Sequence, residues 1–458
     1  TSIVLVQAFN APLFTTSAVY QHLAIIPAAG DFAVTPLWTD SASAGLGRFA
    51  AAPDGNVVYC NGLDTMIWGG SQHRLGAFLN YDDLASTFRY DVTERMLNTT
   101  ENGRTVITLT PDGAGDIWLL IGSTRPIQGI RFVVPVVNTT ASTSTVEYWD
   151  GTAWVAVAGF VDGTAVAGVT LAQTGSMTFT STVATAHVKF ADDRLLYFYR
   201  VKIGDTGTPD ATIQLAPSTV DMPFQAIVDV WDGVLRTPIL CTVNGKDYTL
   251  EVLEASATNP PAGSDPFAAN LTGLVGGQEM LVGFEERVTA IQVRIIAGFA
   301  NAVVSTLTVS YWNGTAWVAL AGINDSTATG GVSFAVSGTV SWDAPSPSLE
   351  YKQTRFGRTG FVYRFAWNAT LSATDIFVDL LTGVPAQRWN AQNPILGYSF
   401  PFTFAGRIMV ARRAGTSELS RIDYSAVGRP DVWNGEQSSD FGKEILIGDQ
   451  TALTSAIE

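Results

Sequence analysis

A fourteen-residue segment occurs twice in this chain, and it constrains the fold more than any other feature of the sequence. The first copy, VEYWDGTAWVAVAG, covers residues 146–159, and the second copy, VSYWNGTAWVALAG, covers residues 309–322. Eleven of the fourteen positions match, at a separation of 163 residues. A match of this length indicates an internal duplication, so we expect two units with the same fold.

Each copy has the pattern of a β-hairpin. Val146 and Tyr148 fall on one face of an extended strand, while Glu147 and Trp149 fall on the other. Asp-Gly in the first copy and Asn-Gly in the second then provide the turn, because these residues tolerate positive φ. The returning strand is residues 154–157, with the sequence WVAV.

The correspondence between the units extends beyond the repeated segment on both sides, to a size typical of a β-sandwich of immunoglobulin-like or jelly-roll type. Later strands are expected at residues 177–180, 197–203, 332–336 and 361–367. The predicted organisation has a β body in three parts, the second with a linker and the third expected to continue beyond the given chain. The predicted ranges are 1–116 (body), 117–216 (sandwich repeat 1), 217–279 (body), 280–382 (sandwich repeat 2) and 383–458 (body).

Three further hairpins lie outside the repeats, near residues 57–68, 238–252 and 404–424. They suggest propeller blades, or strands of one sheet domain, into whose loops the two sandwiches are inserted. A linear string of independent β domains is the alternative. Helix is expected only in short turns, around residues 82–88. The predicted class is therefore all-β, with a propeller-like or multi-sheet body interrupted by two duplicated sandwiches.

Composition supports this class and excludes several functions. Hydrophobic residues make up 47% of the chain and charged residues only 15%, so it is folded and has few charges. The net charge of -15 repels phosphate backbones, and sequence-specific binding to nucleic acid is not expected. The sequence has no apolar stretch of about 18 residues, so no membrane span is predicted.

The residues that could carry catalysis are scattered. His22, His73 and His187 are far apart in the sequence, and no nucleophile, phosphate-binding or dinucleotide-binding motif is present. The adjacent carboxylate pairs point to opposite faces of a strand and do not make a glycosidase pair. We therefore predict a protein that is not an enzyme and has no cofactor.

Two further features have more than one interpretation. Asp112, Asp116, Asp205 and Asp210 lie in Gly-rich turns where Ca²⁺ could bind, but turn formation explains them equally well. The two cysteines, at positions 60 and 241, lie in apolar strand-like contexts. Two separately buried thiols are favoured over a distant disulfide.

The duplicated tryptophans Trp149, Trp154, Trp312 and Trp317 are the candidate contact residues. Exposed tryptophans can stack on sugar rings, which would give a glycan or interface contact. The alternative is that they pack within the sandwich and fix the hairpin register. The exposure of Trp154 and Trp317 distinguishes the two, because buried rings favour a scaffold and exposed coplanar rings favour sugar binding.

Two segments carry a resemblance to a known family. They are residues 54–59 (DGNVVY), followed by Asn61-Gly62 and Trp68-Gly69-Gly70, and residues 425–433 (SAVGRPDVW), followed by ILIGD at residues 445–449. Together they resemble bacteriophage tail structural proteins of the nozzle or tip type, with propeller-like sheets and inserted β-sandwiches. The chain departs from the family pattern at residues 429–431 and after Asp449.

The resemblance implies a non-enzymatic structural component of a virion, located in the tail and assembled as a homo-oligomeric ring. Its partners would be other tail proteins, and its roles would be assembly, with host attachment or DNA passage. The second hypothesis is a secreted or particle-borne glycan-binding adhesin that contacts a host surface glycan through exposed tryptophans.

Overall fold

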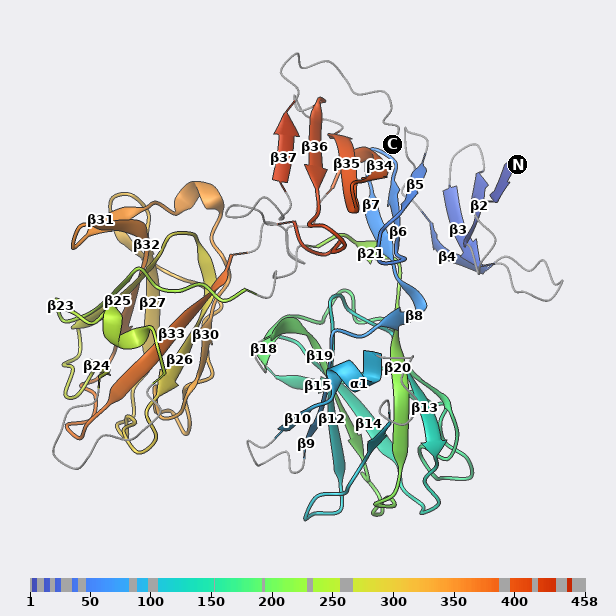
Figure 1. Cartoon of the computed structure of the whole chain (residues 1–458), viewed down its shortest axis with the longest axis horizontal. Helices are drawn as coiled ribbons and strands as arrows, with labels where there is room; N and C mark the ends of the chain where they lie inside the picture. Colours follow the sequence, from blue (N-terminus) through green and yellow to red (C-terminus); the bar gives the residue numbers. More distant parts are fainter. Residues whose placement is uncertain are drawn as a thin grey trace. The chain divides into compact units, whose positions relative to one another are not determined.

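The structure is a computed structural model, and its described residues form antiparallel strands with a few short helices (Figure 1), which confirms the all-β class. Contacts divide the chain into one unit of Thr1–Val230 with Arg388–Glu458 and a second unit of Trp231–Gln387. The described residues are 2–5, 12–16, 21–25, 35–39, 47–81, 89–97, 106–151, 153–191, 194–228, 234–255, 267–386, 396–413, 419–433 and 443–446.

The body in the first unit contains three four-stranded antiparallel sheets. In two of them the strands follow chain order: β1 (Ser2–Leu5), β2 (Pro12–Thr16), β3 (Gln21–Ile25) and β4 (Thr35–Thr39); then β34 (Tyr398–Phe404), β35 (Arg407–Arg413), β36 (Arg421–Tyr424) and β37 (Lys443–Leu446). The third sheet has the order β21-β7-β6-β5, from β5 (Arg48–Ala51), β6 (Val57–Cys60), β7 (Thr65–Trp68) and β21 (Gln225–Ala226).

The third sheet shows how the first sandwich is attached. Its strand β21 pairs with β7, although about 150 residues of sandwich separate the two in the chain. The first sandwich is therefore an insertion within this sheet, between its third and fourth strands. Four strands are the number found in a propeller blade, but no sheet of the described residues closes on itself. The propeller remains a prediction.

A single hydrophobic core joins the two body sheets that flank the insertions in the sequence. Val58, Cys60 and Ile67 from the N-terminal sheet pack with Ile408 and Val410 from the C-terminal sheet. Thr65 supports the same contact, because its hydroxyl accepts a hydrogen bond from the Tyr398 backbone at 3.2 Å. Within this unit, a body interrupted by an insertion is therefore the observed arrangement, and a linear string of domains is not.

The first sandwich consists of two facing sheets with a shared core. One sheet has the order β10-β9-β12-β19-β14-β15, with β18 beside β19, and the other has the order β11-β20-β13-β17-β16, with β8 beside β20. The elements are β8 (Gly70–Arg74), β9 (Ala77–Tyr81), β10 (Arg89–Asp91), α1 (Thr93–Leu97), β11 (Ile107–Thr108), β12 (Ile117–Ser123), β13 (Gly129–Val136), β14 (Ser144–Trp149), β15 (Trp154–Ala156), β16 (Val161–Asp162), β17 (Gly175–Thr178), β18 (Val188–Ala191), β19 (Arg194–Ile203) and β20 (Gln214–Met222).

The second sandwich repeats this arrangement with a core of its own. Its sheets have the orders β23-β22-β25-β32-β27-β28, with β31 beside β32, and β24-β33-β26-β30-β29. The elements are β22 (Leu240–Val243), β23 (Lys246–Asp247), η1 (Leu250–Val252), β24 (Ala269–Asn270), β25 (Glu279–Phe284), β26 (Val288–Ile295), β27 (Leu307–Trp312), β28 (Trp317–Ala319), β29 (Asn324–Asp325), β30 (Gly338–Ser341), η2 (Pro347–Leu349), β31 (Gln353–Arg355), β32 (Arg358–Trp367) and β33 (Phe377–Pro385).

The sheets extend beyond the predicted ranges 117–216 and 280–382. Strands β9 and β10 pair into the first sandwich, and β22 and β23 occupy the same places in the second. A shared hydrogen bond from a strand N–H to a threonine hydroxyl supports this correspondence. The Thr93 hydroxyl accepts a hydrogen bond from Phe78 N, and the Thr249 hydroxyl accepts one from Cys241 N, both at 2.9 Å. The duplication therefore begins near residues 77 and 240, where sequence similarity is too low to reveal it.

Three local predictions need correction or fall outside the described residues. The hairpin predicted at 238–252 belongs to the second sandwich and not to the body, and a 3₁₀ helix replaces the end of its second strand. Residues 332–336 form turns, and the strand begins at Gly338. The helix predicted at 82–88 lies outside the described residues, and the observed helix is α1. The strands predicted at 177–180, 197–203 and 361–367 are present within one to three residues.

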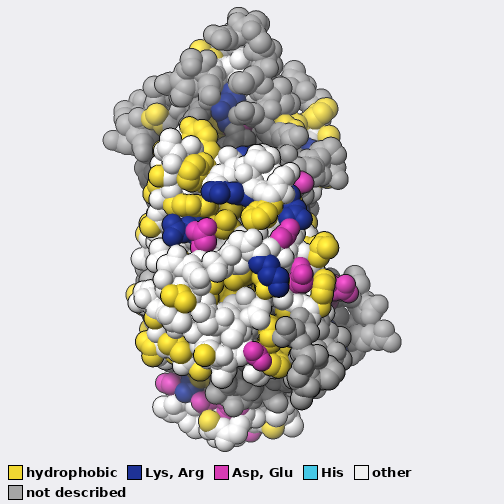
Figure 2. All heavy atoms as spheres, turned by 90° about the vertical axis from the view of Figure 1, so that its left-hand side faces the viewer, with side chains coloured by type: hydrophobic (Ala, Val, Ile, Leu, Met, Phe, Trp, Pro, Cys, Tyr) yellow, Lys and Arg dark blue, Asp and Glu magenta, His cyan; other side chains and the backbone are white. Residues whose placement is uncertain are grey.

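The hairpin turns of the repeated segment are confirmed. Gly151 and Gly314 have φ of 101° and 95°, which a residue with a side chain rarely adopts. Around each turn, Asp150 Oδ1 or Asn313 Oδ1 accepts a hydrogen bond from the backbone three residues later, at 2.7 Å. The face drawn in Figure 2 is mostly uncharged, with hydrophobic, basic and acidic side chains scattered over it.

Candidate functional site

The predicted tryptophans are brought together in pairs. Trp149 lies opposite Trp154 in the β14–β15 ladder, and Trp312 lies opposite Trp317 in the β27–β28 ladder. The ring centroids are 5.7 Å and 5.6 Å apart, and both pairs have an interplanar angle of 70°. This edge-to-face geometry is favourable between aromatic rings. It does not give two coplanar rings on which a sugar could stack.

Cationic side chains cover the pair in the first sandwich. The Lys189 ammonium lies 3.6 Å from the ring centroid of Trp149, which is only 8% exposed. Burial lowers the pKa of Lys189 to about 8. The Arg200 guanidinium lies 5.0 Å from the centroid of Trp154, and its Nε donates to Glu147 Oε2 at 2.6 Å. The rings therefore take part in cation–π contacts within the chain.

The outer tryptophan of each pair also packs on a small apolar cluster of its own sheet. Trp154 contacts the cluster that contains Leu120, Leu196 and Phe198. Trp317 contacts the cluster of Leu240, Leu281 and Val362. Both are partly buried. The four tryptophans thus act mainly in packing, although Trp154, Trp312 and Trp317 keep some contact with solvent.

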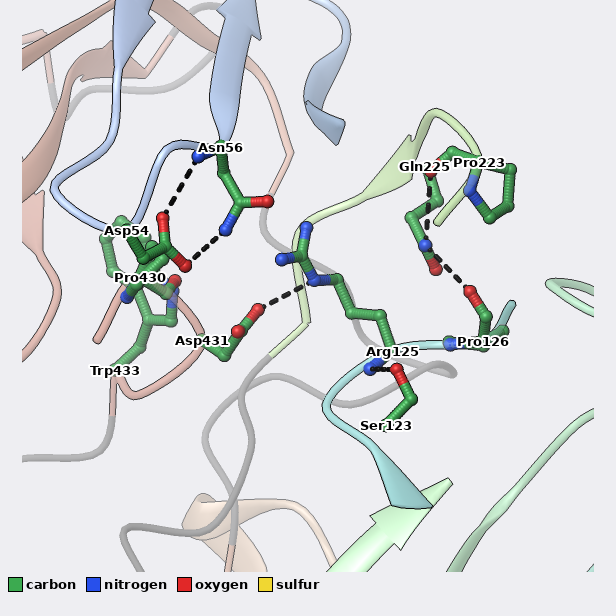
Figure 3. Close-up of polar contacts among 10 residues, drawn as sticks. All are labelled: Asp54, Asn56, Ser123, Arg125, Pro126, Pro223, Gln225, Pro430, Asp431 and Trp433. Carbon is green, nitrogen blue, oxygen red and sulfur yellow. Dashed lines mark hydrogen bonds and ion pairs between the residues drawn. The ribbon is translucent and has the colours of Figure 1, made fainter. Parts of the chain in front are cut away.

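A second group of residues, which the sequence did not single out, joins the first sandwich to the body. Arg125 lies between β12 and β13 and is completely buried. Its Nε lies 2.8 Å from Asp431 Oδ1, and the ion pair links the sandwich to a C-terminal body turn (Figure 3). Among the described residues, Nη1 and Nη2 of Arg125 have no hydrogen-bond partner, so the guanidinium is desolvated and incompletely compensated.

The turn that carries Asp431 is held firmly. Ala426 N donates to Val432 O at 2.7 Å, and Val432 N donates to Arg429 O at 3.1 Å. Trp433, fully buried in the body core, donates its indole N–H to Pro430 O at 2.6 Å (Figure 3). The carboxylate is therefore presented to Arg125 by a rigid turn.

Asp54 and Asn56, at the start of β6, complete this side of the contact. Asn56 is buried, and both its backbone N–H and its side-chain amide donate to the Asp54 carboxylate. Asp54 is exposed as a residue, but desolvation of its carboxyl group and the negative charge of Asp431 raise its pKa to about 6. The two segments that carry the family resemblance, residues 54–59 and 425–433, therefore meet at this point. We call Asp54, Asn56, Arg125 and Asp431 the buried junction.

Two further side chains lie near the buried junction, and one of them connects sandwich and body. Gln225 in β21 is buried and donates from Nε2 to Pro126 O at 3.0 Å (Figure 3). His73 in β8 has its pKa lowered to about 4, first by burial and then by the positive charge of Arg125. The histidine is therefore neutral near pH 7, and it adds no second positive charge beside the guanidinium.

The second sandwich has a buried ion pair at the corresponding loop. Glu286 lies between β25 and β26, is 4% exposed and pairs with Arg236 of the entering segment. Arg236 also exchanges two backbone hydrogen bonds of 2.7 Å with Gly383. Each sandwich therefore uses a charged residue of this loop to hold a segment outside its own two sheets, a body turn in the first and the entering segment in the second. The sequence signal is weak: a single charged residue between two apolar strand runs.

The candidate cysteines, histidines and turn aspartates do not come together in one site among the described residues. Cys60 and Cys241 are both free and buried, as the favoured hypothesis predicted, and burial raises the pKa of both thiols. His187 lies beside the Gly151 turn, away from His73, and the side chain of His22 lies outside the described residues. The turn aspartates accept hydrogen bonds from the chain or pair with Lys202, and no group of three metal-ligating side chains occurs in the described ranges.

Comparisons with known proteins add little to this picture. No family model matches the sequence, and a search of curated proteins finds no match. A solved structure, the CBM32-1 and CBM32-2 domains from Clostridium perfringens ZmpB, aligns with 68% of this chain and 93% of its own at 7% identity and a TM-score of 0.20. At that score the likeness carries no inference. No helix in the described ranges has the length and hydropathy needed to cross a membrane.

Proposed function

We propose that this chain is a non-enzymatic structural component of a bacteriophage virion and forms part of a tail ring. The observation that carries the proposal is the buried junction with the core beneath it. Residues before and after the insertions form one core, and the Arg125–Asp431 pair fixes the inserted sandwich to it. A body that holds an inserted domain through buried contacts can transmit force between subunits without hinging.

The tryptophans support a scaffold more than a sugar-binding surface. Their rings are edge-to-face, they pack on apolar clusters of their own sheets, and Lys189 covers Trp149. Large antiparallel sheets with buried aromatic side chains unfold slowly, a property that suits an extracellular particle. The family resemblance of residues 54–59 and 425–433 supports the assignment to the tail, since these segments build the junction.

A glycan-binding adhesin is the second candidate function. The partial exposure of Trp154 and Trp317 favours it, because each pair retains contact with solvent, through Trp154 in the first and through both rings in the second. This contact would be made at the ring edge and not on a flat double platform.

Immunogold electron microscopy tests the proposal directly. Antibodies raised against the chain should label the tail end of phage particles, and averaged images should place several copies around the tail axis. Labelling absent from tails would contradict the proposal. The glycan-binding adhesin would then be favoured if the purified chain bound to a glycan array and the double substitution Trp154→Ala with Trp317→Ala abolished that binding.

A further inference from the structure

The hairpin formed by β31 and β32 has an unusual tip. Phe356 and Gly357 connect the strands with φ of 48° and 74°, which is the geometry of a two-residue turn that favours Asn-Gly. The β22–β23 hairpin of the same sandwich has Asn244 and Gly245 in this geometry. A phenylalanine in the left-handed region is strained, because its Cβ approaches its own backbone. Local folding therefore does not explain why an aromatic residue is present.

The hairpin exposes aromatic and cationic side chains, both in its turn and in the segment that leads into β31. Phe356, in the turn, is 55% exposed, and Tyr351, two residues before β31, is 53% exposed. Lys352 and Arg355 are exposed as well, and no ion pair of the described residues involves either of them. Arg355 donates to the neighbouring Gln353 at 2.9 Å. We call residues 351–357 the cationic tip.

A comparison of this hairpin with its counterpart in the first sandwich shows which features the two share and which only the second sandwich has. Arg358, the first residue after the turn of this hairpin, pairs with Asp247, and Arg194, the first residue of β19, pairs with Asp91, both at 2.7 Å. The supporting framework is thus the same in both sandwiches. The residues between the strands differ in the sequence: Phe-Gly in the second sandwich corresponds to Asp-Asp at positions 192 and 193, which lie outside the described residues. The chemistry of the cationic tip is therefore additional to the fold.

We propose that the cationic tip docks on an acidic surface of a second copy of this chain. The chain has 41 acidic and 26 basic side chains, so another copy offers the complementary charge. Arginine and aromatic residues are the types that most often dominate interface energies. A contact between two different surfaces of identical subunits closes into a ring when the rotation allows. The inference rests on the proposed ring and identifies a contact that would build it.

Sedimentation velocity of the full chain over a concentration series tests the inference. Phe356→Asn gives the turn a preferred residue and removes the exposed ring, so it should leave the fold intact while weakening self-association by about tenfold or more. Arg355→Glu should weaken association to a similar degree. Ala405→Asn is the matched control, since Ala405 is exposed and has the same place and a φ of 48° in the β34–β35 turn.

Salt provides an independent readout. Raising NaCl from about 0.05 M to about 0.5 M should weaken association of the wild-type chain, because the Debye length shortens. Ala405→Asn should associate like the wild type. If Phe356→Asn and Arg355→Glu also associate like the wild type, the tip is not the contact, and the ring would use another surface. If the wild-type chain stays monomeric throughout, this inference is overturned, while tail labelling separately decides the proposed function.

Discussion

Removing one partner of the Arg125–Asp431 ion pair should destabilise the protein far more than replacing both partners with apolar residues. Arg125 is completely buried and Asp431 is 7% exposed, so removing one partner leaves an uncompensated buried charge. Loss of one member of such a pair typically costs about 3–5 kcal/mol. We therefore expect Arg125→Met and Asp431→Leu each to lower the free energy of unfolding of the first unit by about that amount.

The double substitution should have a different outcome. Nη1 and Nη2 of Arg125 have no hydrogen-bond partner in the described part of the chain, so the native pair does not fully recover the cost of desolvating the guanidinium. An apolar Met–Leu pair avoids that cost. We expect the double variant to lie within about 1 kcal/mol of the wild-type protein or to exceed it.

Urea unfolding of the full chain, followed by intrinsic tryptophan fluorescence and by limited proteolysis, provides the assay. Proteolysis should show that the single variants expose the C-terminal body segment before the sandwiches unfold. The reasoning is refuted if each single substitution costs less than about 1 kcal/mol, or if the double variant loses the sum of the two single effects.

Three further predictions follow from other contacts in the structure. Trp154→Ala and Trp317→Ala should each cost about 2–3 kcal/mol in calorimetry of the full chain, because each ring packs on its own apolar cluster; a cost near zero would show that the rings are free for a ligand. The lowered pKa of His73 means that its contribution to stability is present above about pH 6.5 and is lost as the pH falls towards 4. The raised pKa of Asp54 acts in the opposite direction between about pH 6 and 3.8, so acid unfolding should be steeper in Asp54→Asn and shallower in His73→Gln. Tyr363→Phe should cost about 1–3 kcal/mol in urea unfolding, because it removes a buried hydroxyl that accepts from Val288 N at 2.9 Å and donates to Glu350, and an unchanged midpoint would contradict that role.

The sequence was informative wherever short-range chemistry decides the outcome. The two hairpins of the repeated segment, their glycine turns and the pairing of the tryptophans all depend on neighbours within about ten residues. Alternation of side chains along a strand and the positive φ of Gly151 are sufficient to specify such an element. The all-β class followed from many local signals of this kind, which agree with one another.

The sequence was less informative where a neighbour distant in the chain decides. Residues 332–336 have a strand-like apolar pattern, yet they form turns, and the neighbouring strand β30 begins only at Gly338. Strands β9 and β22 belong to the two sandwiches because they pair with β12 and β25, although their sequences do not reveal the duplication. Strand pairing supplies a context that propensity alone does not contain.

The sequence by itself determined that this chain is built from antiparallel β-strands and contains one sandwich twice. Only the tertiary structure decided that Arg125 and Asp431, some 300 residues apart, form a buried pair between sandwich and body. The physical reason is that a turn or a strand face is fixed by covalent geometry and adjacent side chains. The partner of a buried charge is instead fixed by which surfaces exclude water together, and that depends on the whole fold.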